Sequence, residues 1–333
     1  MLTRHGRVTF RRGIWHCPRC GTGHAPFDEQ AQVPPGNASW AVREGIALLG
    51  AWMPFRRAAS TYERLTGLTV SARSAENWTE ALGAAYAPPV LDRYGPGPVV
   101  DTLFVEADAT MVWFDDGWHE VKTVVCWGRK DGEDLRARYL TGEGSWESLG
   151  ERIHQLARRQ GLRRAGQVVL LADGAPPIWK VFGRWLPRSL ELLDWYHLQQ
   201  HLAEVAALLP AGKEWQETQA AALAERGPAE TLRAVAALAQ GGATAAVRQT
   251  ARRCLAYLQE HRQRLDYPRA RALGYPIGSG RVESACGHVV QQRLKLAGMQ
   301  WAHTHATAVL NVRCADLNDD WDHACQQLIA KAA

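Results

Sequence analysis

Three acids of this chain occupy positions at which a carboxylate could do chemistry. Asp108 lies near the end of a predicted strand, on the face opposite its apolar row, and Asp173 directly follows a second, continuously apolar strand. Open sheets usually bind ligands at the carboxyl ends of their strands. Glu283 lies in the first turn of a predicted helix, on the stripe that packs inward, where a carboxylate is costly unless it is paired or binds metal. Together these acids could bind Mg²⁺, which hydrolysis of a phosphodiester needs to activate water and stabilise the leaving oxygen.

Each acid also has a plainer interpretation. Asp108 and Asp173 could be solvated residues at strand ends, and Glu283 could cap its own helix from position N3, with Gly280 as the N-cap. Glu106 rivals Asp108 as the first ligand, because residues two apart share one face of a strand.

A second set of ligands could gather on one helix. His197 and His201 are four residues apart and could bind zinc together with Asp194. Leu198 stands where the His-Glu-x-x-His motif has its general base, so the metalloprotease pattern fails. We therefore favour structural hydrogen bonding near an active site for these side chains.

Two cysteines form half of a zinc ribbon. Cys17 and Cys20 flank a Pro-Arg turn in which two thiolates can bind one zinc ion, and His16 and His24 lie on either side. No second Cys-x-x-Cys pair exists, so the knuckle either binds Zn²⁺ with other ligands or is a plain turn. The other five cysteines are scattered and are interpreted as reduced core thiols.

The elements that must position these residues form an α/β core. Residues 103–113 and 118–127 alternate in polarity and predict an antiparallel hairpin, to which residues 136–140 add a strand. A helix over 146–160 then precedes apolar strands at 167–172 and 189–193, which an intervening helix separates, so these two strands are expected to pair in parallel.

Helices dominate the rest of the chain. Residues 39–86 predict three helices, the last two forming a helix-turn-helix outline that a plain three-helix bundle would also give. Residues 198–265 are rich in Ala, Leu, Glu, Gln and Arg and predict an all-helical insertion. A tight loop at 275–280 opens the helix over 281–296 that carries Glu283.

Composition excludes little beyond a membrane protein. The chain has 333 residues, of which 46% are hydrophobic and 22% charged, and no apolar stretch long enough to span a bilayer. The first residues lack the apolar core of a secretory signal, so a cytoplasmic protein is expected. A net charge of +5 permits contact with nucleic acid without requiring it.

Four segments carry a resemblance to a known group. Residues 105–110, 170–174, 193–197 and 278–284 resemble bacterial insertion-sequence transposases of the Kra type, which are related to the Mutator-like group. The most specific stretch runs from Pro276 to Trp301. The resemblance implies a DDE transposase with an RNase H-like catalytic core, a mixed sheet with helices that is interrupted by a helical insertion.

The resemblance also implies roles for individual residues. Asp108, Asp173 and Glu283 become a metal-binding triad for two Mg²⁺ or Mn²⁺ ions, and Asp194 and His197 become the Asp-x-x-His signature downstream of the second acid. Near this site, three basic residues could neutralise phosphates: Arg281, Arg293 and Lys295. A second basic group could do the same or form a solvated helix face: Arg152, Arg158, Arg159, Arg163 and Arg164.

The expected organisation follows from these assignments. Residues 1–37 form a partial zinc-ribbon region and 38–95 a helical DNA-binding region. Residues 96–200 and 274–333 form the RNase H-like core, interrupted by the helical insertion at 201–273. The resemblance further implies that the partner is double-stranded DNA, as terminal inverted repeats and target, which would place the protein at the nucleoid. It also implies a homodimer or higher oligomer, because two ends must be held together.

One departure supports an alternative function. The resembling transposases usually carry an earlier Cys-x-x-Cys, so this chain could be an N-terminally truncated copy that binds DNA without cutting it. A third hypothesis is a zinc hydrolase of small substrates using Asp194, His197 and His201. It predicts that zinc chelation abolishes activity while Asp173→Asn spares it.

Overall fold

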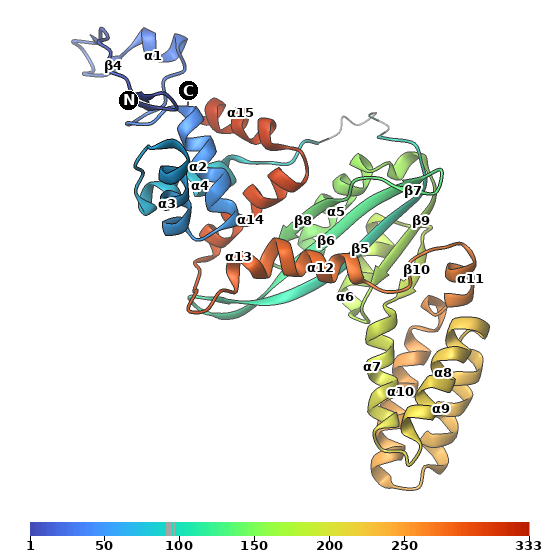
Figure 1. Cartoon of the computed structure of the whole chain (residues 1–333). Coiled ribbons are helices and arrows are strands. Elements are labelled where there is room, and N and C mark those ends of the chain that lie inside the picture. The colour runs from blue at the N-terminus through green and yellow to red at the C-terminus, as the bar shows by residue number, and fades with distance from the viewer. Residues whose placement is uncertain (91–94, 96, 333) are drawn as a thin grey trace.

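The structure, a computed structural model, describes residues 1–90, 95 and 97–332. Its centre is a mixed sheet covered by helices, with a helical region at one end and a protruding helical insertion at the other (Figure 1). The boundary expected between residues 95 and 96 falls partly outside the described residues. Among the described helices, none has both the length and the apolar character needed to cross a membrane.

The sheet is built around one long hairpin. Strands β5 (Val100–Phe114) and β6 (Gly117–Lys130) pair antiparallel across a tight turn, which confirms the predicted hairpin. The outer edge of β6 pairs antiparallel with the short strands β7 (Glu133–Asp134) and β8 (Arg138–Gly142).

The other edge of β5 carries two further strands, and their parallel pairing with each other is confirmed. Strand β9 (Ala165–Ala172) pairs with β5, and β10 (Leu190–Leu193) pairs with β9. The crossovers are the helices α5 (Trp146–Arg159) and α6 (Pro176–Trp185). The strand order is therefore β10-β9-β5-β6, with β7 and β8 beyond β6.

Alternate residues of β5 enter two separate cores, as the period of two in a strand requires. Leu103 and Val105 pack with α5 and α6 on one face of the sheet. Phe104 and Val112 belong to the core of the other face, which C-terminal helices cover.

The helical run that carries Glu283 is less regular than the single helix expected over 281–296. It consists of α12 (Gly280–Ala285), a π-helical turn η3 (Cys286–Gln291) and the short α13 (Gln292–Leu294). The π-helical turn was not predicted, because it leaves no signature in the spacing of the apolar residues.

The helical region contains the three helices predicted from the sequence. They are α2 (Trp40–Trp52), α3 (Phe55–Thr66) and α4 (Ala72–Ala85), and Ser71 caps α4 through the backbone N–H of Ser74. The last two helices of the chain, α14 (His303–Leu317) and α15 (Trp321–Ala332), share an apolar cluster with α2 and α4. The C-terminal segment therefore joins the helical region to the sheet.

The insertion protrudes beyond the end of β10 (Figure 1). Its helices are α7 (Trp195–Ala206), α8 (Gly212–Arg226), α9 (Ala229–Gly241), α10 (Ala245–Glu260) and α11 (Tyr267–Ala272). Helix α7 is continuous from the edge of the sheet into the insertion, and the apolar core of the insertion merges with that of α5 and α6.

The N-terminal region consists of small elements. Strands β1 (Leu2–Thr3) and β2 (Gly6–Arg7) form one short hairpin, and β3 (Trp15–His16) and β4 (Gly23–His24) form another that carries the cysteine knuckle. Helix α1 (Pro26–Gln30) follows.

Candidate active site

Asp173 and Asp108 lie at the carboxyl end of the parallel strands. Asp173 follows β9, and its Oδ1 accepts a hydrogen bond from the backbone N–H of Ala175 at 2.9 Å. The last residue of β9, Ala172, pairs with Ala107, so Asp108 lies one residue beyond that pair. Asp108 is in the middle of β5 rather than near its end as expected, because the hairpin continues past β9.

The half-buried carboxylate of Asp108 has few donors. Its Oδ1 accepts a hydrogen bond from the backbone N–H of Ala109 at 2.7 Å, while Oδ2 faces the thiol of Cys286 at 3.9 Å. Burial is the largest cause of the raised pKa of Asp108, and the negative charges of Asp173 and Glu283 raise it further. The hydrogen bond from the Ala109 N–H and the charge of His197 act in the opposite direction and lower it. The three acids, far apart in sequence, therefore act on one another electrostatically.

Glu283 reaches this neighbourhood from an exposed position. The prediction that it packs inward is wrong, because its side chain is exposed and Val282 and Ala285 face the core instead. The N-cap of α12 is Ser279 rather than Gly280, and the Ser279 hydroxyl donates to Glu283 Oε1 at 3.0 Å. The helix end thus orients the carboxylate without burying it.

The three carboxylates are ligands of the type that hard cations prefer, although they do not surround a single ion. Among the described residues, the carboxylate oxygens of Asp108, Asp173 and Glu283 do not all lie within 4.8 Å of one another. Two Mg²⁺ ions about 4 Å apart would not require that, because the outer acids can bind different ions. The repulsion that raises the pKa of Asp108 is the kind that bound cations relieve.

A buried aspartate holds the loop that starts α12. Asp194 is fully buried, and its Oδ1 accepts a hydrogen bond from the backbone N–H of Ser279 at 2.6 Å. The Trp195 N–H donates to the carbonyl of Ile277 at 3.0 Å, which brings the loop against the end of β10. A Cβ on Gly278 would lie 2.8 Å from the Tyr196 ring, so glycine is required for this close approach.

The same aspartate orients His197. Asp194 Oδ2 accepts hydrogen bonds from the backbone N–H and from Nδ1 of His197, both at 2.8 Å. The hydrogen bond to Asp194 raises the pKa of His197 most, and the charges of Asp194, Asp173 and Asp108 add to it, while burial opposes the rise. The structure therefore places the imidazole within electrostatic reach of the two strand acids.

Glu106, the rival for the first ligand, is 1% exposed and serves α12 instead. Its Oε2 accepts a hydrogen bond from the backbone N–H of Val282 at 2.8 Å, while its buried Oε1 has no hydrogen-bond partner among the described residues. Burial raises the pKa of Glu106 to about 7. Its carboxyl group lies beneath the helix, whereas that of Asp108 is only half-buried.

The helical run follows β5 residue by residue. Glu106 contacts Val282, and Asp108 lies opposite Cys286. Gln291 then donates from Nε2 to the hydroxyl of Thr110 at 3.0 Å. Glu106, Asp108 and Thr110 share one face of β5, and the π-helical turn runs from the second of these contacts to the third.

Two of the three basic residues predicted near the site have other partners. Arg281 pairs with Asp134 and lies over the Trp127 ring at 4.3 Å. Arg293 is 1% exposed and donates from Nε to the carbonyl of Gly50 at 3.1 Å. Arg293 therefore joins the helical run to α2, and the expectation that it neutralises phosphate is wrong. Lys295, in contrast, is exposed.

The second basic group is also partly structural. Arg159 donates to both carboxylate oxygens of the buried Asp320, at 2.9 and 2.5 Å, and Arg152 donates to the carbonyl of Thr141 at 3.2 Å. Arg158 is buried, whereas Arg163 and Arg164 are exposed. A solvated helix face does not describe this group.

The alternative zinc set does not come together in the described chain. His201 packs on Tyr257 with ring centroids 3.9 Å apart, and the carboxylate of Asp194 is occupied by the hydrogen bonds described above. Asp194, His197 and His201 do not place three ligand atoms within 4.8 Å of one another.

The cysteine knuckle is a tight, exposed turn. The Gly21 N–H donates to the carbonyl of Cys17 at 2.9 Å, and the Cys20 thiol lies 2.7 Å from the Thr22 hydroxyl. Hydrogen bonding to Thr22 lowers the pKa of Cys20 to about 7. Within the described residues no third His, Cys, Asp or Glu ligand lies within 4.8 Å of both thiols.

Sequence analysis missed two groups of ligand side chains that the fold assembles. Asp116, His119 and His303 form one, and Glu76, Glu80 and His305 form the other, each with three ligand atoms within 4.8 Å of one another. Asp116 lies in the turn between the two predicted strands of the hairpin. No local spacing could have linked it to His303, which is 187 residues away.

Comparison with known proteins places the chain in a family without assigning it an activity. No curated protein matches it. The model of the uncharacterised protein family UPF0236 matches residues 26–324, and the chain therefore belongs to that family.

Proposed function

We propose that this protein is a DDE transposase that cuts DNA at the ends of an insertion sequence and joins the ends to target DNA. Asp108, Asp173 and Glu283 would hold two Mg²⁺ ions. The observation that carries the proposal is that acids from distant segments share one neighbourhood. Asp108 and Asp173 each follow a residue of the Ala107–Ala172 strand pair, and the charges of Asp173 and Glu283 add to the rise that burial causes in the pKa of Asp108.

The sheet supports an RNase H-like core. Its strands β5, β6 and β8 are antiparallel neighbours, with the two-residue β7 also on β6, and the later β9 and β10 extend the opposite edge in parallel. This order is compatible with the RNase H-like fold that the resemblance implies. The helical insertion lies between the second and third acids in sequence, also as the resemblance implies.

The chemistry divides between bound ions and protein. The Mg²⁺ ions, when bound, would activate the attacking water or 3′-hydroxyl and stabilise the leaving oxygen. Asp194 positions the acid-bearing helix by holding the Ser279 N–H, and it fixes His197 beside the acids. Ser279 orients the Glu283 carboxylate from the helix end.

The helical region supports DNA contact. Helices α3 and α4 are joined by a short turn at Gly67, as in a helix-turn-helix, and carry four exposed arginines: Arg56, Arg57, Arg64 and Arg73. Such residues neutralise phosphates and hold a protein on the duplex while other contacts specify sequence.

The proposal is tested with DNA fragments that carry the inverted repeats flanking the gene. We expect Mg²⁺-dependent or Mn²⁺-dependent strand cleavage that leaves a 3′-hydroxyl and is lost on chelation or in Asp173→Asn. Asp322→Asn, an exposed acid on α15, is the matched control and should cut normally.

Each other outcome points elsewhere. Binding of the repeats without cleavage by the unmodified chain would favour a catalytically inactive DNA-binding protein. Activity on small substrates that zinc chelation removes and Asp173→Asn spares would favour a zinc hydrolase instead.

A further inference from the structure

The tip of the β5–β6 hairpin is tied to the start of α14, far along the chain. The backbone N–H of Asp115 donates to the carbonyl of Trp301 at 3.0 Å. The ring of His303, the first residue of α14, stacks on Phe114 with centroids 4.3 Å apart and an interplanar angle of 8°.

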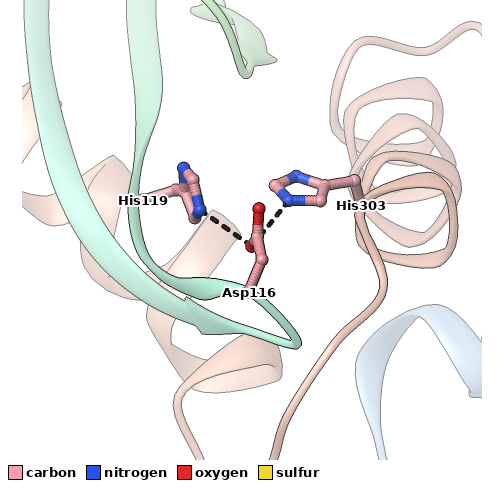
Figure 2. Close-up of side chains that lie close together, drawn as sticks. All are labelled: Asp116, His119 and His303. Atoms are coloured by element: carbon pink, nitrogen blue, oxygen red, sulfur yellow. Dashed lines mark hydrogen bonds and ion pairs between the residues drawn. The ribbon is translucent and has the colours of Figure 1, made fainter.

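Three ligand-bearing side chains converge at this contact (Figure 2). Nε2 of His119 lies 2.8 Å from Asp116 Oδ1, and Nε2 of His303 lies 3.0 Å from the same oxygen. Asp116 comes from the hairpin turn, His119 from β6 and His303 from α14, so no two of these elements alone could form the group.

An outer carboxylate fixes one of the imidazoles. Nδ1 of His303 is hydrogen-bonded to Glu143 Oε2, and the hydroxyl of Thr307 donates to Glu143 Oε1 at 2.8 Å. Metal-binding histidines commonly donate their second ring N–H to a carboxylate in this way, which leaves the other nitrogen free to coordinate. The group thus has an outer support as well as three ligands.

We propose that Asp116, His119 and His303 bind a divalent transition-metal ion, with Zn²⁺ the ion expected. Imidazole nitrogen favours zinc and its neighbours over Mg²⁺, and two histidines with one carboxylate plus water complete a tetrahedral zinc site. The side chains of Asp116, His119 and His303 are 57%, 42% and 40% exposed, so solvent reaches the fourth position.

The bound ion would cross-link the hairpin tip to α14. The segment that begins with α12 and Glu283 runs through α13 to α14, so the cross-link would hold the end of this segment opposite to Glu283. The second group, Glu76, Glu80 and His305, carries no equivalent proposal, because it holds two carboxylates and no described carboxylate supports the second nitrogen of His305.

The test measures zinc per chain in the full-length protein. Cys17→Ser and Cys20→Ser are introduced first, so that the knuckle contributes no zinc, and excess Mg²⁺ is present to occupy the acids around Asp108. After removal of unbound metal, we expect one zinc equivalent per chain. His119→Gln or Asp116→Asn should remove it, whereas His5→Gln, at an exposed histidine outside the group, should retain it.

Glu143→Gln keeps all three ligands and should weaken zinc binding by about 10–100-fold, as loss of an outer carboxylate does. The visible absorption of bound Co²⁺ provides a readout on the unmutated group and does not depend on whether a variant folds. No zinc equivalent and no Co²⁺ absorption in the double-cysteine background, or an equivalent that survives His119→Gln in a folded chain, would overturn the proposal. None of these measurements depends on DNA cleavage.

Discussion

Asp194 and Asp108 lie at the same edge of the sheet, but the fold shifts their pKa values in opposite directions. Burial raises the pKa of Asp194, yet hydrogen bonds from His197 and Ser279 outweigh it and lower that pKa overall. In the part of the chain that the structure describes, the carboxylate of Asp108 accepts a backbone hydrogen bond from Ala109 alone. Burial together with Asp173 and Glu283 leaves its pKa raised.

This difference in pKa distinguishes an aspartate that supports the structure from one that could bind a metal ion. A carboxylate with all its donors in place holds a loop and has no oxygen to spare, as Asp194 holds Ser279. A carboxylate among other acids with a free oxygen is destabilised as an anion until a cation arrives. We therefore expect Asp194 to matter for stability and Asp108 for activity.

The largest expected effect is on cleavage by the triad. Asp108→Asn should lower the cleavage rate about 10³-fold, because metal-ion stabilisation of the transition state contributes several kcal/mol. Its free energy of unfolding should not fall, since the substitution removes a repelled charge and leaves an acceptor for the Ala109 N–H. Rates of DNA nicking and urea unfolding curves measure the two quantities.

Glu106→Gln is the matched control for this prediction. Glu106 lies two residues away on the same strand face, but it contacts the backbone of Val282 rather than the open site. The control should cut within about tenfold of the unmodified chain, a change of about 1.4 kcal/mol. A larger loss in Glu106→Gln than in Asp108→Asn would reverse our assignment of the first ligand.

The second largest effect is the loss of folding stability when Asp194 is replaced. Asp194→Ala should lower the free energy of unfolding by about 2–3 kcal/mol, because it removes charge-assisted hydrogen bonds to the Ser279 and His197 N–H groups. Urea unfolding near neutral pH measures the loss. An unchanged midpoint would contradict the view that Asp194 supports the loop.

A third effect depends on pH and on Glu106. Burial raises the pKa of Glu106 to about 7 in the folded chain, whereas the ordinary pKa of a glutamate is 4.5. Stability should therefore fall as pH rises through this window, by up to about 3 kcal/mol, because the folded state binds more protons than the unfolded state there. Unfolding at about pH 5 and about pH 8 measures this slope. Persistence of an equal slope in Glu106→Gln would assign it to another group.

The smallest effect distinguishes two basic residues. Lys295 is exposed, so Lys295→Ala should reduce the salt dependence of DNA binding by about one phosphate contact. Arg281→Ala should change it less, because Arg281 is paired with Asp134 and packed on Trp127. DNA affinity measured over a range of salt concentrations compares the two variants. Equal slopes of affinity against salt would show that Arg281 gives up Asp134 and Trp127 to bind DNA.

Local patterns predicted much of the fold. The alternation around Asp108 predicted the hairpin, and the apolar run before Asp173 predicted a buried parallel strand. The three helices predicted over residues 39–86 are present as α2, α3 and α4. These features depend on residues close in sequence, so one segment at a time is enough to infer them.

Features that depend on distant segments were missed. The hydrogen bond from Val282 to Glu106 and the cluster around Asp116 join residues that no spacing relates. Arg293 was expected to neutralise phosphates near the site, but its guanidinium group lies over the rings of Phe55 and Trp301, at 4.6 and 4.9 Å from their centroids. Charge alone does not indicate whether an arginine meets aromatic rings in the folded chain.

The central claim is that Asp108, Asp173 and Glu283 together bind divalent cations, and anomalous X-ray scattering from crystals soaked in Mn²⁺ tests it most directly. We predict one or two Mn²⁺ peaks within about 2.2 Å of carboxylate oxygens of these acids, a distance typical of hard-cation ligation. Well-diffracting crystals with no Mn²⁺ at these three side chains, or with Mn²⁺ only at other groups, would contradict it.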